Sequence, residues 1–143
     1  MTPTPLPPAA TRLAYAGLLP FVLGAVLLWV VREDAHPYVA MALSGYAAVI
    51  ISFLGGIHWG FGFAQPRPAA SLFAWGVVPS LVAWVAVVLP PYAGLVVHGA
   101  MLGVCYLVDR RVYPLQGAAH WLTVRFRLSA VAALSCFVGA AGS

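Results

Sequence analysis

Five long apolar runs constrain this chain more than any other feature of its sequence. An α-helix needs about 20 apolar residues to cross about 30 Å of hydrocarbon, and each run is close to that length. A helix also satisfies its own backbone hydrogen bonds inside lipid. The runs therefore predict an all-α integral membrane bundle of five transmembrane helices. They cover residues 13–31, 38–63, 69–89, 92–108 and 121–141.

The composition supports a membrane protein and argues against an ordinary soluble domain. Of the 143 residues, 63% are hydrophobic and 7% are charged, and the mean hydropathy is +0.96. The segments between the runs are too short to fold independently, so residues 12–143 are predicted to form one five-span domain. Residues 1–11 are rich in proline and carry no charged side chain, which is typical of a disordered tail.

The arginines predict the orientation of the bundle. With five spans, Arg32 falls at one end of the bundle and all the other arginines fall at the opposite end. Because positively charged segments stay in the cytoplasm, we expect a multi-pass protein of the cell inner membrane with a cytoplasmic N-terminus and a periplasmic C-terminus. This pattern accounts for the net charge of +4 without a nucleic-acid partner. The other arginines are Arg12, Arg67, Arg110, Arg111, Arg125 and Arg127.

The second run carries small residues on two faces and is expected to form the centre of the bundle. On one face small residues recur at every fourth position, which predicts close helix packing. His58 projects from a different face, between Gly55 three positions before it and Gly62 four positions after it. An ionisable side chain within a span, in a notch between glycines, is a candidate site. The packing face consists of Ser44, Ala48, Ser52, Gly56 and Gly60.

Membrane depth predicts which polar groups can meet. His58 lies about 9 Å from the end of its span, and Asp109 and Arg125 lie near the same membrane boundary. We therefore expect these residues, with Trp59 in the same leaflet, to form a polar or ligand-binding cluster. Two structural alternatives stay open. Asp109 can form an ion pair at the membrane surface, and His58 can be a neutral imidazole bonded within a packed interface.

The sequence predicts no cofactor, no metal site and no catalytic residue. His58 and His98 are expected about 12 Å apart along the membrane normal, which disfavours a haem held between them. Haem bound through one histidine, or a quinone hydrogen-bonded by His58, stays an alternative. An enzymatic role is disfavoured because the chain lacks paired carboxylates, a His-Glu-x-x-His helix and a Gly-x-Ser-x-Gly elbow.

Several short motifs together resemble an uncharacterised family of small bacterial inner-membrane proteins, a domain of unknown function with a mitochondrial transmembrane relative in animals. The resemblance covers about residues 13–135. It implies the membrane fold and marks His58, Trp59, Asp109 and Arg125 as signature residues, but it implies no activity. Ser129 departs from the threonine expected in the family. The matching motifs are residues 17–21, Tyr46, residues 52–60, Trp75, residues 79–81, Trp84, Asp109, Trp121, Arg125, Leu128 and Ser129.

These features favour an accessory or assembly protein that acts through helix packing and an inner-leaflet polar cluster. Its expected partners are the lipid bilayer, other membrane proteins and a second copy of the chain. A haem- or quinone-binding protein that uses His58 is the alternative. A small transporter or channel would require an oligomer, because few polar groups lie near the membrane midplane.

Overall fold

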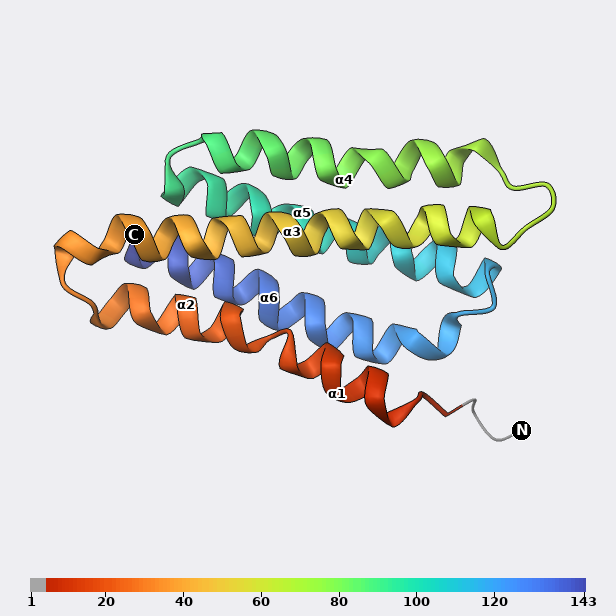
Figure 1. The fold of residues 1–143 in the computed structure, drawn as a ribbon, viewed down its shortest axis with the longest axis horizontal. Helices are drawn as coiled ribbons and strands as arrows, with labels where there is room; N and C mark the ends of the chain where they lie inside the picture. Colours follow the sequence, from red (N-terminus) through yellow and green to blue (C-terminus); the bar gives the residue numbers. More distant parts are fainter. Residues whose placement is uncertain (1–4) are drawn as a thin grey trace.

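The computed structural model describes residues 5–143, in which all regular secondary structure is helical (Figure 1). Five helical segments are long and apolar enough to cross a membrane, as predicted. Short 3-10 turns at Glu33–Ala35 and Ala119–Trp121 precede two of the helices. The α-helices are α1 (Pro8–Ala16), α2 (Leu19–Val30), α3 (His36–Phe63), α4 (Ala70–Val88), α5 (Pro91–Leu115) and α6 (Leu122–Gly142).

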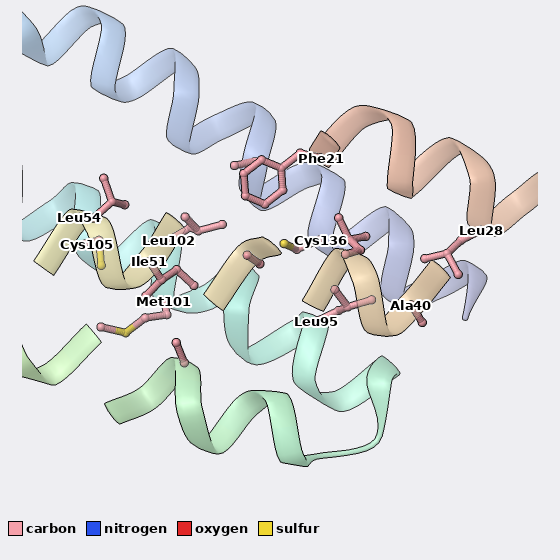
Figure 2. Packing of buried hydrophobic residues seen from close by; sticks show 14 residues of the cluster. Phe21, Leu28, Ala40, Ile51, Leu54, Leu95, Met101, Leu102, Cys105 and Cys136 are labelled. Carbon is pink, nitrogen blue, oxygen red and sulfur yellow. The ribbon is translucent and has the colours of Figure 1, made fainter. Parts of the chain in front are cut away.

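Helix α3 is the central element of the bundle. It runs between α4 on one side and α2 on the other, and it also contacts α5 and α6 (Figure 1). Its buried face includes Leu43, Ile51 and Leu54, which pack with Leu95 and Leu102 of α5 (Figure 2). This contact holds α3 and α5 together along their length. The polar side chains of α3 and those of α5 are therefore held at fixed positions relative to one another.

The first span is two helices instead of one. Helix α1 ends at Ala16 and α2 begins at Leu19, with Pro20 in its first turn, where the missing N–H of proline costs least. The Tyr46 hydroxyl donates to the Gly17 carbonyl, with 2.6 Å between the oxygens, and so satisfies a backbone group at the break. Helix α1 also includes residues 8–11, so the prediction of a disordered tail is wrong there. Residues 1–4 lie outside the described residues.

Helix α5 is longer than predicted and places Asp109 inside it. The predicted span ends at residue 108, but the helix continues to Leu115. Gly117 lies two residues beyond this end, and its φ of +71° suits glycine. The Ala118 N–H donates to the Tyr113 carbonyl and the Gly117 N–H to the Pro114 carbonyl, the bond pair of a Schellman motif.

The close packing of α3 uses a different glycine face from the one predicted. A methyl group added at Gly55 would overlap the Gly76 carbonyl of α4, and one added at Gly62 would overlap the Phe73 ring. At Gly56 and Gly60 an added methyl group meets nothing within 4 Å. The prediction that Gly56 and Gly60 pack against neighbouring helices is therefore wrong within this chain. Ser44 is buried, whereas Ala48 and Ser52 are partly exposed.

Candidate functional site

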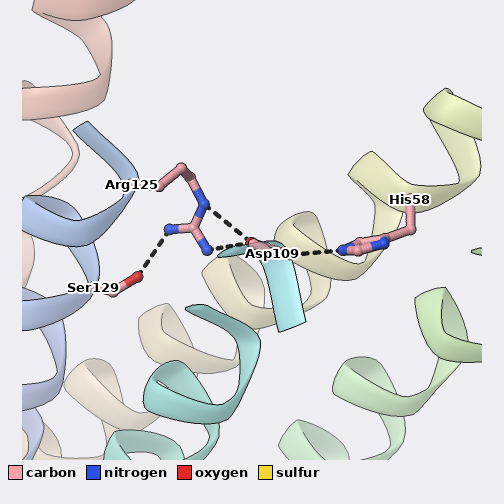
Figure 3. A network of polar contacts seen from close by, with 4 residues as sticks. All are labelled: His58, Asp109, Arg125 and Ser129. Carbon is pink, nitrogen blue, oxygen red and sulfur yellow. Dashed lines mark hydrogen bonds and ion pairs between the residues drawn. The ribbon is translucent and has the colours of Figure 1, made fainter. Parts of the chain in front are cut away.

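Three helices bring their polar side chains together near the arginine-rich end of the bundle. His58 comes from the last two turns of α3, Asp109 from α5, and Arg125 from the first turn of α6. Ser129 lies four residues after Arg125, one turn further along the same face of α6. We call His58, Asp109, Arg125 and Ser129 the polar cluster (Figure 3).

Asp109 is the centre of the polar cluster because both of its carboxylate oxygens are used. Its Oδ1 lies 2.7 Å from His58 Nε2, and its Oδ2 lies 3.1 Å from Arg125 Nε and 2.5 Å from Arg125 Nη2. Arg125 Nη1 donates to the Ser129 hydroxyl at 2.9 Å. Two nitrogens of Arg125 thus donate to the same oxygen, Oδ2, which leaves Oδ1 for His58.

The polar cluster is removed from both water and lipid. The exposed fraction is 1% for His58, 1% for Asp109 and 7% for Arg125. His58 Nδ1 is buried without a hydrogen-bond partner among residues 5–143. A protonated ring would place an unpaired N–H there, so the contacts favour a neutral imidazole that donates from Nε2 to Asp109. With one carboxylate and one guanidinium, the cluster is then electrically neutral.

The structure brings together three of the four predicted site residues. His58, Asp109 and Arg125 meet as expected, but Trp59 points to another face of α3. Its indole N–H donates to the Phe73 carbonyl at 3.0 Å, and its ring contacts the Phe73 ring edge to face. Asp109 does form the ion pair that was left open as an alternative, with Arg125, and both side chains are buried within the bundle.

The glycine notch predicted beside His58 is filled by α4. Gly55 and Gly62, which flank His58, let the backbone at Gly76 and the ring of Phe73 approach α3 closely. These glycines therefore serve helix packing and leave no space for a ligand on that side of His58. Access to the cluster must come from the opposite side, where α5 and α6 contribute Asp109 and Arg125.

His98 occupies a separate buried position. Its Nε2 lies 3.0 Å from the Ser44 hydroxyl, and its side chain is fully buried. His98 precedes Asp109, the partner of His58, by eleven residues on α5, which corresponds to about 16 Å along a helix. This separation disfavours a haem held by His58 and His98 together. Among residues 5–143, no group of three or more His, Cys, Asp or Glu side chains could hold a metal ion.

A cavity of about 560 Å³ lies next to the polar cluster, enclosed by α1, α2, α3, α5 and α6. Arg125 and Ser129 form part of its wall, whereas His58 and Asp109 do not. Most of the wall is apolar. Leu13 and Phe53, which are 74% and 66% exposed, also line it, so the cavity opens on the outer surface of the bundle.

Sequence reasoning missed two residues beside the site. Ser129 was noted only as a departure from a resemblance, although its position four residues after Arg125 indicates contact on one helix face. Tyr113 lines the cavity from α5, but it lies beyond the predicted span of residues 92–108 and directly before Pro114. A proline near the end of a helix removes only one backbone donor, so it does not by itself end the helix.

Comparisons with known proteins give a family and two relatives. A family model described as "Protein of unknown function (DUF3429)" matches residues 6–141. Transmembrane protein 69 of Xenopus tropicalis is 38% identical over 117 residues, which cover 76% of this chain and 44% of that protein. Transmembrane protein 69 of Mus musculus is 27% identical over 135 residues, covering 92% of this chain and 55% of the mouse protein. This chain thus spans about half the length of these relatives. No solved structure matches.

Proposed function

The chain belongs to the family described as "Protein of unknown function (DUF3429)", and from that premise we propose that it is an accessory membrane protein that holds a lipid-soluble component of the bilayer. The observation that carries this proposal is the cavity beside Arg125 and Ser129. It combines a largely apolar wall, an opening on the outer surface and a few polar groups at one place. This is the usual composition of a small-molecule site.

The polar cluster supports this role by fixing the shape of the cavity. Asp109 ties α3 and α6 to α5 through His58 and Arg125. Three of the helices that enclose the cavity are therefore joined at its polar end. A binding site held by such contacts loses less conformational freedom when a ligand enters. The protein would then act by binding and presenting a membrane component, and it would need no chemical step of its own.

The test is purification of the tagged protein from its native membrane in a mild detergent, followed by organic extraction and mass spectrometry. Ala14 lines the cavity from α1, and Ala14→Phe should fill part of it. Ala16 is exposed and does not line the cavity, so Ala16→Phe is the matched control. We expect a retained lipid-soluble molecule with the unchanged protein and with Ala16→Phe, at near equimolar amount, and its loss in Ala14→Phe.

Equal retention by Ala14→Phe and the unchanged protein would overturn the proposal. The same preparations would be analysed for co-purifying membrane proteins, since an accessory role implies a partner. A partner retained by all three proteins would place the partner contact away from the cavity.

A further inference from the structure

The cavity wall beside the polar cluster offers hydrogen-bond donors. A guanidinium carries five N–H groups, and three of those on Arg125 donate to Asp109 and Ser129. Two are left for other acceptors. The Ser129 hydroxyl accepts from Arg125, so its own hydrogen is free to donate, and residues 5–143 supply no acceptor for it.

Tyr113 adds a third donor at the same end of the cavity. Its side chain is buried and lines the cavity, and its ring contacts Phe61 edge to face with 5.3 Å between the ring centroids. The hydroxyl lies beside the Arg125 guanidinium. Because a guanidinium can only donate, Arg125 cannot accept the phenol hydrogen, which is left for another acceptor.

The charge of the polar cluster selects the kind of acceptor. Asp109 balances Arg125, and the contacts of His58 favour its neutral form, so the cluster already has no net charge. An anion in the cavity would be an uncompensated charge in an apolar surrounding, which is costly. A neutral carbonyl oxygen avoids that cost and accepts two hydrogen bonds.

The rest of the wall suits a flat ring with an apolar tail. Aromatic side chains from three helices and from the turn before α6 line it: Phe21, Phe53, Phe61, Tyr113 and Trp121. Aromatic rings pack favourably against other flat rings, edge to face or offset. The volume of about 560 Å³ lies in the range of small-molecule sites, about 300 to 1,000 Å³. The opening near Leu13 and Phe53 provides an exit for a tail into the bilayer.

We propose that the cavity binds a neutral lipid-soluble quinone, with one ring carbonyl accepting hydrogen bonds from the Ser129 and Tyr113 hydroxyls beside Arg125. This inference rests on the proposed function and names the ligand of the same site. It differs from the sequence-based alternative because His58 does not touch the ligand. His58 instead holds Asp109, which holds Arg125.

The experiment uses the purified full chain in nanodiscs of saturated phosphatidylcholine. One probe is a benzoquinone with a decyl tail, and the second is a benzene ring with the same tail and no oxygen. A bound quinone quenches a nearby indole, and Trp121 lines the cavity, so binding is read from tryptophan fluorescence. Trp121→Phe identifies the part of the signal that comes from the cavity. Binding of the oxygen-free probe is measured by its competition with the quinone.

Two conservative variants test the donors. Ser129→Ala and Tyr113→Phe each remove one hydroxyl and keep Arg125 paired with Asp109. Loss of one hydrogen bond to a neutral acceptor costs about 1 kcal/mol, which corresponds to about fivefold weaker binding. We expect this loss for the quinone and no change for the oxygen-free probe. Ala14→Phe should abolish saturable binding of both probes, and Ala16→Phe should preserve it.

The outcomes separate the inference from the proposed function. Equal affinity for the two probes, or unchanged quinone affinity in both hydroxyl variants, overturns the quinone inference and leaves a cavity that takes apolar chains, such as the acyl chain of a phospholipid. Unchanged quinone binding in Ala14→Phe would mean that the quinone binds outside the cavity, and it would overturn both the quinone inference and the proposed function. Saturable quinone binding that is weaker in Ser129→Ala and in Tyr113→Phe supports both the quinone inference and the proposed function.

Discussion

Asp109 is the residue on which the polar cluster depends, since His58 and Arg125 both contact it. The sequence predicted that these three residues converge, because each could be assigned a depth from its distance to a span end. It did not predict their burial. Depth is a one-dimensional property, whereas burial depends on which helix faces which neighbour, and no local sequence pattern around Asp109 specifies that.

Asp109→Asn should destabilise the bundle strongly. It leaves Arg125 buried without a counter-charge, and removal of one partner from a buried ion pair typically costs about 3 to 5 kcal/mol. The measurement is the midpoint of thermal unfolding in detergent, followed by size-exclusion chromatography. Asp34→Asn is the matched control because its ion pair with Arg32 is largely exposed, and it should have little effect.

The double variant Asp109→Leu with Arg125→Met keeps this prediction testable if the single variant does not fold. Because it removes both charges, we expect it to be more stable than Asp109→Asn. An unfolding midpoint for Asp109→Asn equal to that of the unchanged protein would contradict the role of the polar cluster as a clamp between helices.

At the scale of helices, the sequence predicted the five spans well and the packing face of α3 poorly. Span prediction needs only the sum of hydropathy over about 20 residues, which is a local quantity. Helix α3 has small residues on two faces, one with Gly55 and Gly62 and one with Gly56 and Gly60. Which of them meets α4 depends on the rotation of the helix, and this rotation follows from contacts distant in sequence.

A pair of neighbouring glycines therefore gives a clear test of helix packing. Gly55→Ala should lower stability by about 1 to 3 kcal/mol, because the new methyl group overlaps the Gly76 carbonyl. Gly56→Ala should leave the stability of the monomer unchanged or slightly raised, since alanine favours helices and the position is open. Thermal unfolding of both variants in the same detergent checks this. Equal loss of stability in both would show that α3 is rotated differently.

At the scale of the whole molecule, the arginines predict that the N-terminus is cytoplasmic, and this orientation stays a prediction. It can be tested by cysteine labelling, since Cys105 and Cys136 are buried. An impermeant maleimide should label Ser143→Cys in whole cells, and it should label Pro66→Cys only after the membrane is opened. The reverse pattern would place the arginine-rich end outside.

The domain organisation and the cavity differ in how far a sequence can predict them. Short connections such as that between α4 and α5 leave too little chain for a second folded unit between the spans, so the sequence alone can predict one domain. The cavity could not be predicted, because residues from α1, α3 and α6 form it jointly. Helix α1 contributes to it from beyond the break near Gly17, and a sequence shows a break but not the direction that the chain takes after it.

Helix α1 has no buried residue, and it borders the opening of the cavity. It is tied to the bundle by the Tyr46 bond at Gly17 and by Arg127 Nη1, which donates to the Tyr15 hydroxyl at 3.3 Å. Local opening of such a segment requires much less free energy than global unfolding. Exchange of a ligand with the bilayer can therefore be fast while α3, α5 and α6 stay locked. Residence time would depend on α1, and selectivity would depend on Arg125, Ser129 and Tyr113.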